Sequence, residues 1–121
     1  GFSHSEKHSE SGRIQKVKQY VVDHYPEHLK LSDLAELVGM SPVSFSRFFH
    51  QRTGRTLSEY IVDIRLGFAA MMLVDKKKNI SEICYECGFN NLSNFNRIFK
   101  ARRNCTPREF RAMYKKNKVL V

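Results

Sequence analysis

The chain has 121 residues, enough for one domain or two small subdomains, and its 21 Lys or Arg against 12 Asp or Glu give a net charge of +9. This positive excess favours a polyanionic partner, either nucleic acid or an anionic membrane surface. No apolar run approaches the roughly 20 residues of a membrane span, no signal-peptide pattern opens the chain, and an odd count of cysteines suits reduced thiols, so we expect a soluble cytoplasmic protein.

The chain opens with a polar lead-in and one amphipathic helix. Residues 1–12 are polar and lack periodicity, which predicts a disordered lead-in or linker. Apolar residues at helical spacing then predict a helix over residues 13–25, which Pro26 ends. Its apolar face is expected to consist of Ile14, Val17, Val21, Val22 and Tyr25.

A helix-turn-helix arrangement follows. Ser32 is expected to cap a short helix, which Gly39 ends because glycine forms a left-handed C-terminal cap without steric cost. Ser41 caps the next helix, residues 42–53, which has proline at its first position and stops at Gly54. Two short helices joined by a brief glycine-containing turn are typical of the helix-turn-helix motif.

Residues 56–75 predict one long helix that is apolar on two sides. Thr56 and Glu59 form a capping box at its start. A helix with two apolar sides is buried on two sides, so we expect it to connect two packed units. Gly67 lies in mid-helix, and we interpret it as a site of close packing. The two apolar sets are Leu57, Tyr60, Ile61, Ile64, Phe68, Met71 and Met72, and Val62, Leu66, Ala69 and Leu73.

The helix-turn-helix pattern then repeats. The offset is 49 residues up to the turn and 50 beyond it, which one inserted residue in the second turn explains. An ordered run of matches of this kind indicates an internal repeat. The matched pairs are Ser32 with Ser81, Leu34 with Ile83, Ala35 with Cys84, Gly39 with Gly88, Phe45 with Phe95, Arg47 with Arg97, Phe49 with Phe99, Gly54 with Asn104, Thr56 with Thr106, and Tyr60 with Phe110.

The repeat predicts an all-α fold of two helix-turn-helix subdomains, 13–55 and 76–116, joined by the connecting helix 56–75, with residues 117–121 as an unassigned tail. The last helix starts with a second capping box, formed by Thr106 and Glu109. We expect it to turn Phe110, Met113 and Tyr114 inward and Arg108, Arg111, Lys115 and Lys116 outward.

The helix after each turn is the one suited to enter a DNA major groove, so residues 42–53 and 92–103 are the predicted recognition helices. Arg pairs with guanine through a bidentate fork, Asn pairs with adenine, and apolar side chains pack on thymine methyls. The candidate base-contacting residues are Val43, Ser44, Ser46, Arg47, His50, Leu92, Ser93, Asn96 and Arg97. A solvent or phosphate role stays open for Ser44, Ser46, His50 and Ser93, and Arg47 could instead bind phosphate or a neighbouring carboxylate. Helix N-termini and cations bind phosphate, which makes Ser41, Thr56, Asn91, Lys100 and Thr106 the candidate phosphate contacts.

Other chemistries find less support. Cys84 and Cys87 have metal-ligand spacing, but no second ligand pair stands at suitable spacing, so we predict buried thiols, no metal and no cofactor. The helical spacing of Phe45, Phe48, Phe49, Phe89, Phe95 and Phe99 favours core packing over base stacking. No nucleophile, base and orienter converge, so no enzyme is expected. The alternative is a basic amphipathic membrane-surface protein or a non-specific nucleic-acid-binding protein.

Three segments resemble the DNA-binding domain of the AraC/XylS family of bacterial transcription regulators, namely LAELVGMSPVSFSRFF, IRLGFAAMML and ISEICYECGFNNLSNFNRIFKARRNCTPREFR. The resemblance covers residues 14–114 and implies seven helices, double-stranded DNA and RNA polymerase as partners, and action as an activator. It also implies a separate sensing or dimerisation domain, N-terminal to this stretch, and a stand-alone two-unit activator is the other interpretation. Asn104 stands where the family has glycine, Asn94 where an aromatic residue is common, and Leu92 where a polar residue is frequent.

Overall fold

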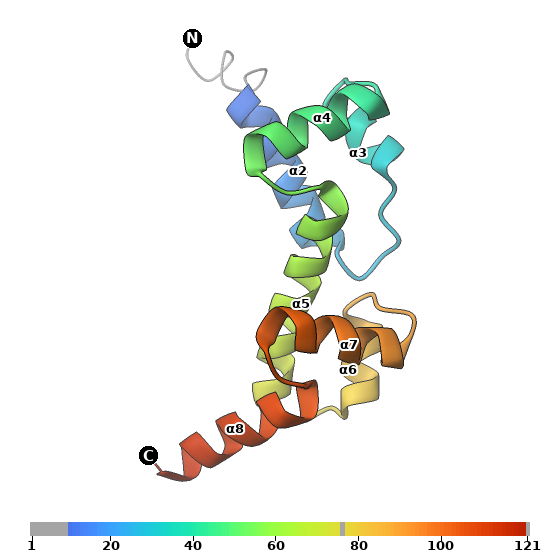
Figure 1. Ribbon diagram of the computed structural model, residues 1–121. Helices are drawn as coiled ribbons and strands as arrows, with labels where there is room; N and C mark the ends of the chain where they lie inside the picture. The colour runs from blue at the N-terminus through green and yellow to red at the C-terminus, as the bar shows by residue number, and fades with distance from the viewer. Residues whose placement is uncertain (1–9, 76, 121) are drawn as a thin grey trace. The chain divides into compact units, whose positions relative to one another are not determined.

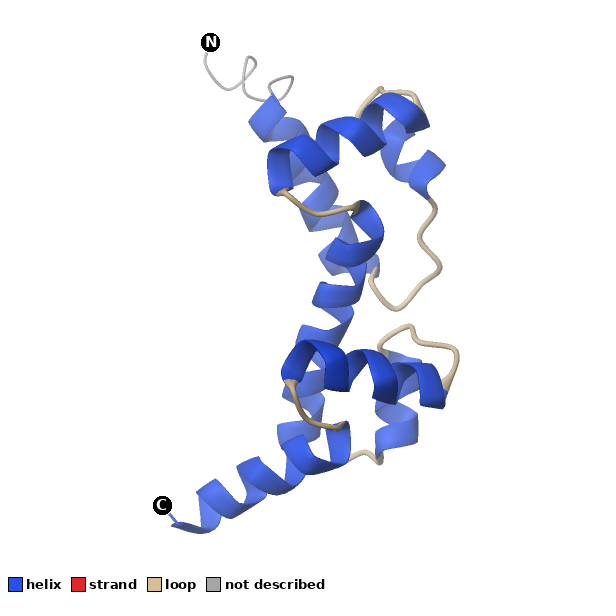
Figure 2. Ribbon diagram, in the orientation of Figure 1, coloured by secondary structure: helices blue, strands red, loops and turns tan. Residues whose placement is uncertain are grey.

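The computed structural model describes the backbone of residues 10–75 and 77–120 and the side chains of residues 11–75 and 77–115. These residues form seven α-helices and no strand, which confirms the predicted all-α fold (Figures 1 and 2). The helices are α2 (Glu10–His24), α3 (Leu31–Leu37), α4 (Pro42–Thr53), α5 (Leu57–Asp75), α6 (Ile80–Glu86), α7 (Leu92–Arg103) and α8 (Pro107–Leu120).

The chain divides into two compact units, Gly1–Ile64 and Arg65–Val121, which we call unit 1 and unit 2. The division falls inside α5, so the first part of this long helix belongs to unit 1 and its second part to unit 2. The sequence-based division, which sets residues 56–75 apart as a connecting helix, stays a prediction.

Helix ends differ from expectation at both termini of the chain. α2 begins at Glu10, inside the predicted lead-in. The sequence did not reveal this start because Ser11 and Gly12 are weak helix formers. Residues 1–9, the rest of that lead-in, lie outside the described residues. α8 continues to Leu120, so the predicted tail is helical up to that residue, and Val121 lies outside the described part.

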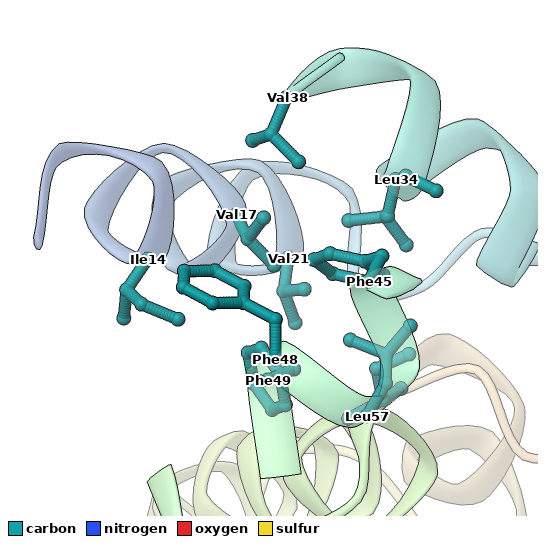
Figure 3. Close-up of a cluster of buried hydrophobic side chains, with 11 residues drawn as sticks. Ile14, Val17, Val21, Leu34, Val38, Phe45, Phe48, Phe49 and Leu57 are labelled. Carbon is teal, nitrogen blue, oxygen red and sulfur yellow. The ribbon is translucent and has the colours of Figure 1, made fainter. Parts of the chain in front are cut away.

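Unit 1 is built around one apolar core to which all of its helices contribute (Figure 3). The predicted phenylalanines Phe45, Phe48 and Phe49 are buried in it. Val22 is 37% exposed, contrary to expectation, because it lies beside the buried stripe of α2. The core consists of Ile14, Val17 and Val21 from α2, Leu34, Ala35 and Val38 from α3 and its C-cap, Phe45, Phe48 and Phe49 from α4, and Leu57 and Ile61 from α5.

Unit 2 repeats this core with a second set of residues. Its buried side chains are Leu66, Ala69, Ala70, Leu73, Ile83, Cys84, Cys87, Phe89, Phe95, Phe99 and Phe110. In each unit, rings at matched positions join the second helix of the motif to the helix that follows it. The ring centroids are 5.8 Å apart for Phe45–Phe49, 5.7 Å for Phe49–Tyr60, 5.9 Å for Phe95–Phe99 and 5.5 Å for Phe99–Phe110. The edge-to-face contacts Phe49–Tyr60 and Phe99–Phe110, which reach the next helix, are favourable and so help to fix the orientation of α4 and α7.

The turns of the two motifs are also equivalent. Gly39 has a φ of 70° and Gly88 a φ of 97°, in the left-handed region that glycine adopts freely. The next residue in each unit closes the helix end, since the N–H of Met40 donates to Ala35 and the N–H of Phe89 donates to Cys84. The left-handed Asn104, with a φ of 63°, takes the place of Gly54, as predicted.

One predicted cap is wrong and one was missed. α3 begins at Leu31, so Ser32 lies inside its first turn, and Lys30 occupies the cap position without a side-chain hydrogen bond. α6 has a true capping box, in which Asn79 Oδ1 accepts from the Glu82 N–H at 2.8 Å and Glu82 Oε1 accepts from the Asn79 N–H at 3.2 Å. In the sequence, the three lysines that precede Asn79 conceal this cap.

Two features of α5 differ from expectation. Met71 is 67% exposed although it belongs to an apolar stripe, because the described part of unit 2 does not cover that side of the helix. A Cβ on Gly67 would meet no heavy atom within 4 Å, so the interpretation of Gly67 as a close-packing site is wrong.

The predicted faces of α8 are partly reversed. Phe110 is buried as expected, but Met113 and Tyr114 are 52% and 40% exposed, because unit 2 covers α8 only near its start. Arg111, which we expected to be solvated, donates from Nε to the carbonyl of Leu73 at 3.0 Å and from its guanidinium to the carbonyl of Lys78 at 2.6 Å. The guanidinium thereby binds carbonyls at and beyond the C-terminal end of α5, where the helix dipole favours a cation.

Candidate nucleic-acid interface

The outer face of α4 carries the side chains predicted to contact bases in unit 1. Because Phe45, Phe48 and Phe49 occupy the buried face of α4, the positions on the opposite face of the helix are exposed to solvent. Val43 is 71% exposed, so this face offers one apolar side chain that a partner can contact. The exposed candidates are Val43, Ser44, Ser46, Arg47 and His50, as the sequence predicted.

An open hollow lies against this face of α4. It has a volume of about 590 Å³ and is lined by Leu31, Pro42, Val43, Ser46, Arg47, His50 and Thr56, all from unit 1. Its walls combine apolar groups, hydroxyls, an imidazole and one guanidinium. The edges of base pairs in a major groove offer the matching set of hydrogen-bonding groups and thymine methyls.

The N-terminus of α4 keeps its positive dipole unneutralised. Ser41 is the N-cap, and its hydroxyl oxygen accepts from the N–H of Ser44 at 3.3 Å. The first turn contains no acidic residue. The same holds for α7, where Asn91 caps the helix by accepting from the N–H of Asn94 at 2.7 Å. Both helix ends therefore suit an anion such as phosphate.

The outer face of α7 differs from that of α4 in detail. Ser93, Arg97 and Lys100 are exposed, whereas Leu92 and Asn96 are half-buried. A guanidinium nitrogen of Arg97 donates to Asn94 Oδ1, a hydrogen bond that was not predicted from the sequence. Positions three residues apart face each other on a helix, so the spacing of these two residues was the available signal. Asn94 thus holds Arg97 near the start of the recognition helix.

The N-termini of α5 and α8 are a different case. The N–H of Thr56 donates to Glu59 Oε1 at 2.9 Å, and the N–H of Thr106 donates to Glu109 Oε1 at 2.8 Å. The backbone hydrogen bond from Thr106 holds the pKa of Glu109 below its usual value, so that carboxylate is charged. Each of these two ends is already occupied by an anion of the chain itself, which leaves less for a phosphate to bind there.

Several cations near the second motif are engaged within the chain. Lys78 donates to Glu86, and this hydrogen bond raises the pKa of Lys78. Burial lowers the pKa of Arg65. Lys76, the first of the three consecutive lysines 76–78, lies outside the described residues. Lys77, Arg103, Arg108 and Lys115 are exposed and make no ion pair among the residues described.

The cysteines are free thiols in apolar surroundings. Cys84 and Cys87 are fully buried, which confirms their predicted place in the core, and Cys105 is half-buried. Burial raises the pKa of Cys87 to about 11 and also raises the pKa of Cys84, so both stay protonated near neutral pH. The S–H group of Cys87 donates a hydrogen bond to Met72 Sδ, with 3.7 Å between the two sulfur atoms. Within the described ranges no three His, Cys, Asp or Glu side chains are grouped to hold a metal ion, and no helix is long and apolar enough to cross a membrane.

Comparison with known proteins places the chain in a family. Residues 34–113 match the family model of a helix-turn-helix domain. The chain is 31% identical over 111 residues to the HTH-type transcriptional activator RhaS of Mannheimia succiniciproducens, a match that covers 92% of this chain and 40% of RhaS. It spans 60%, 35% and 38% of the length of three other curated bacterial regulators that it matches.

Two solved structures show the same fold. A transcriptional regulator with an AraC-type DNA-binding domain from Chromobacterium violaceum superimposes with a TM-score of 0.79 at 30% identity, covering 84% of this chain and 91% of that one. The DNA-binding domain of AdpA, crystallised with a target DNA, superimposes with a TM-score of 0.80 at 23% identity, covering 86% of this chain and 94% of that one. With two matched helix-turn-helix units and this family match, the chain belongs to the AraC-type family of helix-turn-helix DNA-binding domains.

Proposed function

We propose that this chain binds double-stranded DNA sequence-specifically, as the DNA-binding domain of a bacterial transcription regulator. α4 and α7 act as its recognition helices in two successive major-groove segments. The observation that carries the proposal is the matched pair of Arg47 and Arg97. Each lies exposed on a helix whose opposite face is locked in a phenylalanine core.

Base recognition is assigned to the outer faces of these two helices. Arg47 and Arg97 suit guanine through bidentate hydrogen bonds, and Asn96 suits adenine. Val43 and Leu92 can pack on thymine methyl groups. Leu92 is half-buried, so it makes this contact with the accessible part of its side chain. The shorter polar side chains Ser44, Ser46, His50 and Ser93 complete the two faces.

Phosphate binding is assigned to the N-termini capped by Ser41 and Asn91 and to the exposed Lys100. Thr56 and Thr106, which the sequence also suggested, are less suited. Their backbone N–H groups already donate to Glu59 and Glu109, and these carboxylates repel a phosphate.

We further propose that the chain is part of a longer regulator, because it spans 35–60% of three curated relatives. The remaining length would hold a sensing or dimerisation domain. RhaS is called a transcriptional activator, and an activator role with RNA polymerase as second partner follows by analogy. The runner-up function is non-specific nucleic-acid binding, which the net charge of +9 alone would support.

The test begins with selection of binding sites from a random pool of duplex DNA. We expect a site of two segments about one helical turn, or 10 base pairs, apart. Arg97→Ala should then cost about 1–3 kcal/mol at one base pair and relax specificity there, and Arg47→Ala should do so in the other segment. Lys16→Ala, which removes one positive charge from the exposed face of α2, is the matched control and should leave the base preference intact.

Two outcomes would contradict the proposal at different levels. If Arg97→Ala weakened binding equally on all sequences, Arg97 would be a phosphate contact. If the selection returned no preferred sequence at moderate salt, the non-specific function would be the better description.

A further inference from the structure

The positive charge of the chain is carried by one unit only. Unit 1, residues 1–64, contains eight Lys or Arg and eight Asp or Glu, so its net charge is zero. Unit 2, residues 65–121, contains thirteen Lys or Arg and four Asp or Glu, so it carries the whole excess of +9. Two units with the same fold and matched recognition helices therefore present very different fields to a polyanion.

The contacts of the acidic side chains increase this difference. In unit 2, Glu82 and Glu109 belong to capping boxes and Glu86 is bound to Lys78. In unit 1, Asp33 and Glu36 are exposed on α3, the helix before the recognition helix, and pair with no cation among the residues described. A phosphate that approaches the motif of unit 1 meets two carboxylates on α3 that no described cation neutralises, whereas one of the two carboxylates of α6, Glu86, is neutralised by Lys78.

The cations are distributed in the same sense. The last turn of α7 contains Lys100, Arg102 and Arg103, whereas that of α4 contains only His50 and Arg52. Arg108 and Lys115 add exposed charge on α8. The first part of α5, which takes the place of α8 in unit 1, carries Glu59, the match of Glu109, and in addition Asp63. Asp63 Oδ2 lies 2.6 Å from a guanidinium nitrogen of Arg55.

We propose that the two units divide the work of DNA binding. Unit 2 holds duplex DNA of any sequence through its phosphates, and unit 1 joins only where base pairs match the outer face of α4. Phosphate neutralisation releases counterions and gives affinity without regard to sequence, and unit 2 is the unit with charge available for it. Unit 1 has a net charge of zero, so apart from the phosphate at the Ser41-capped helix end its binding depends on the contacts of Val43, Ser46, Arg47 and His50 in the hollow along α4. This inference rests on the proposed function and adds to it the roles of the two motifs.

The first experiment measures the salt dependence of binding to random-sequence duplex DNA with the whole chain. One triple variant removes three exposed charges from unit 2, Arg103→Gln, Arg108→Gln and Lys115→Gln. Its matched control removes three charges from unit 1, the half-exposed Arg13→Gln and the exposed Lys16→Gln and Lys30→Gln. In the unit 2 variant, we expect the slope of log K against log[salt] to fall by about 0.9 for each phosphate that is no longer neutralised. The unit 1 variant should keep the slope of the parent chain.

The second experiment locates each unit on DNA. A photocrosslinking amino acid at Val43 on α4 or at Ser93 on α7 reports which helix touches the duplex. On the selected site both positions should crosslink, and on random DNA position 93 should crosslink several-fold more than position 43. Helical circular dichroism of each variant verifies that the fold is kept.

Equal reduction of the slope in the two triple variants, or equal crosslinking of both helices on random DNA, would overturn the division of roles. Both measurements use random DNA, so they remain decisive even if no preferred sequence exists. In that case the proposed specific function fails, while the assignment of phosphate binding to unit 2 is judged separately.

Discussion

Replacing Gly67 by alanine tests the packing of α5 at the point where the helix passes from unit 1 to unit 2. Gly67 lies within α5 and has no positive φ, and a Cβ there would meet no heavy atom within 4 Å. Glycine inside a helix costs about 0.5–1 kcal/mol relative to alanine, because it loses more backbone freedom on folding. The added methyl group touches nothing, so it adds no packing energy. We therefore expect Gly67→Ala to stabilise the chain by about 0.5–1 kcal/mol.

The assay is urea and thermal unfolding followed by helical circular dichroism. The urea midpoint should rise at an unchanged m-value, and the melting temperature should rise by about 2–6 °C. Gly54→Ala is the matched control, because a Cβ there also meets nothing within 4 Å but the backbone has a φ of +76°. A left-handed alanine costs about 1–2 kcal/mol, so the same chemical change should destabilise there. Destabilisation by Gly67→Ala would refute the reasoning and restore the interpretation of close packing.

Three further predictions concern unit 2. Arg111→Ala should destabilise the chain by about 1–3 kcal/mol in urea unfolding, because it leaves the carbonyls of Leu73 and Lys78 without this donor. An unchanged urea midpoint would show that water replaces the guanidinium. In the folded chain, maleimide at neutral pH should modify Cys105 and spare the buried Cys84 and Cys87, whereas in urea all three should react. Equal rates of modification of the three thiols in the folded chain would contradict the burial of Cys84 and Cys87. The lowered pKa of Glu109 stabilises the folded state above its unfolded pKa of about 4.3, and this gain is lost as the pH falls through the lower folded value. Urea midpoints of Glu109→Ala and the parent chain should therefore differ near neutral pH and converge in acid, and a constant difference would exclude the charge as the cause.

The features that the sequence predicted correctly depend on residues close to one another in the chain. The N-caps Ser41 and Asn91, the capping box of Thr56 and the left-handed Gly39 each involve hydrogen bonds within a few residues. The phenylalanine core followed from helical spacing, and the second unit followed from the offset of the repeat. Because one face of α4 must be buried, the exposure of its opposite face, with Arg47, was predictable too.

The features that only the tertiary structure decided depend on what another segment covers. Arg111 and Met113 both lie on α8, yet Arg111 donates hydrogen bonds to a carbonyl far away in the chain. Met113 faces solvent, because unit 2 covers only the start of α8. The open space around Gly67 likewise depends on neighbours that helical periodicity does not name. The number of charges in each half could be counted in the sequence. Which of them are free to meet DNA was decided by the fold, since capping boxes and ion pairs engage the acids of α6 and α8 and leave Asp33 on α3 exposed.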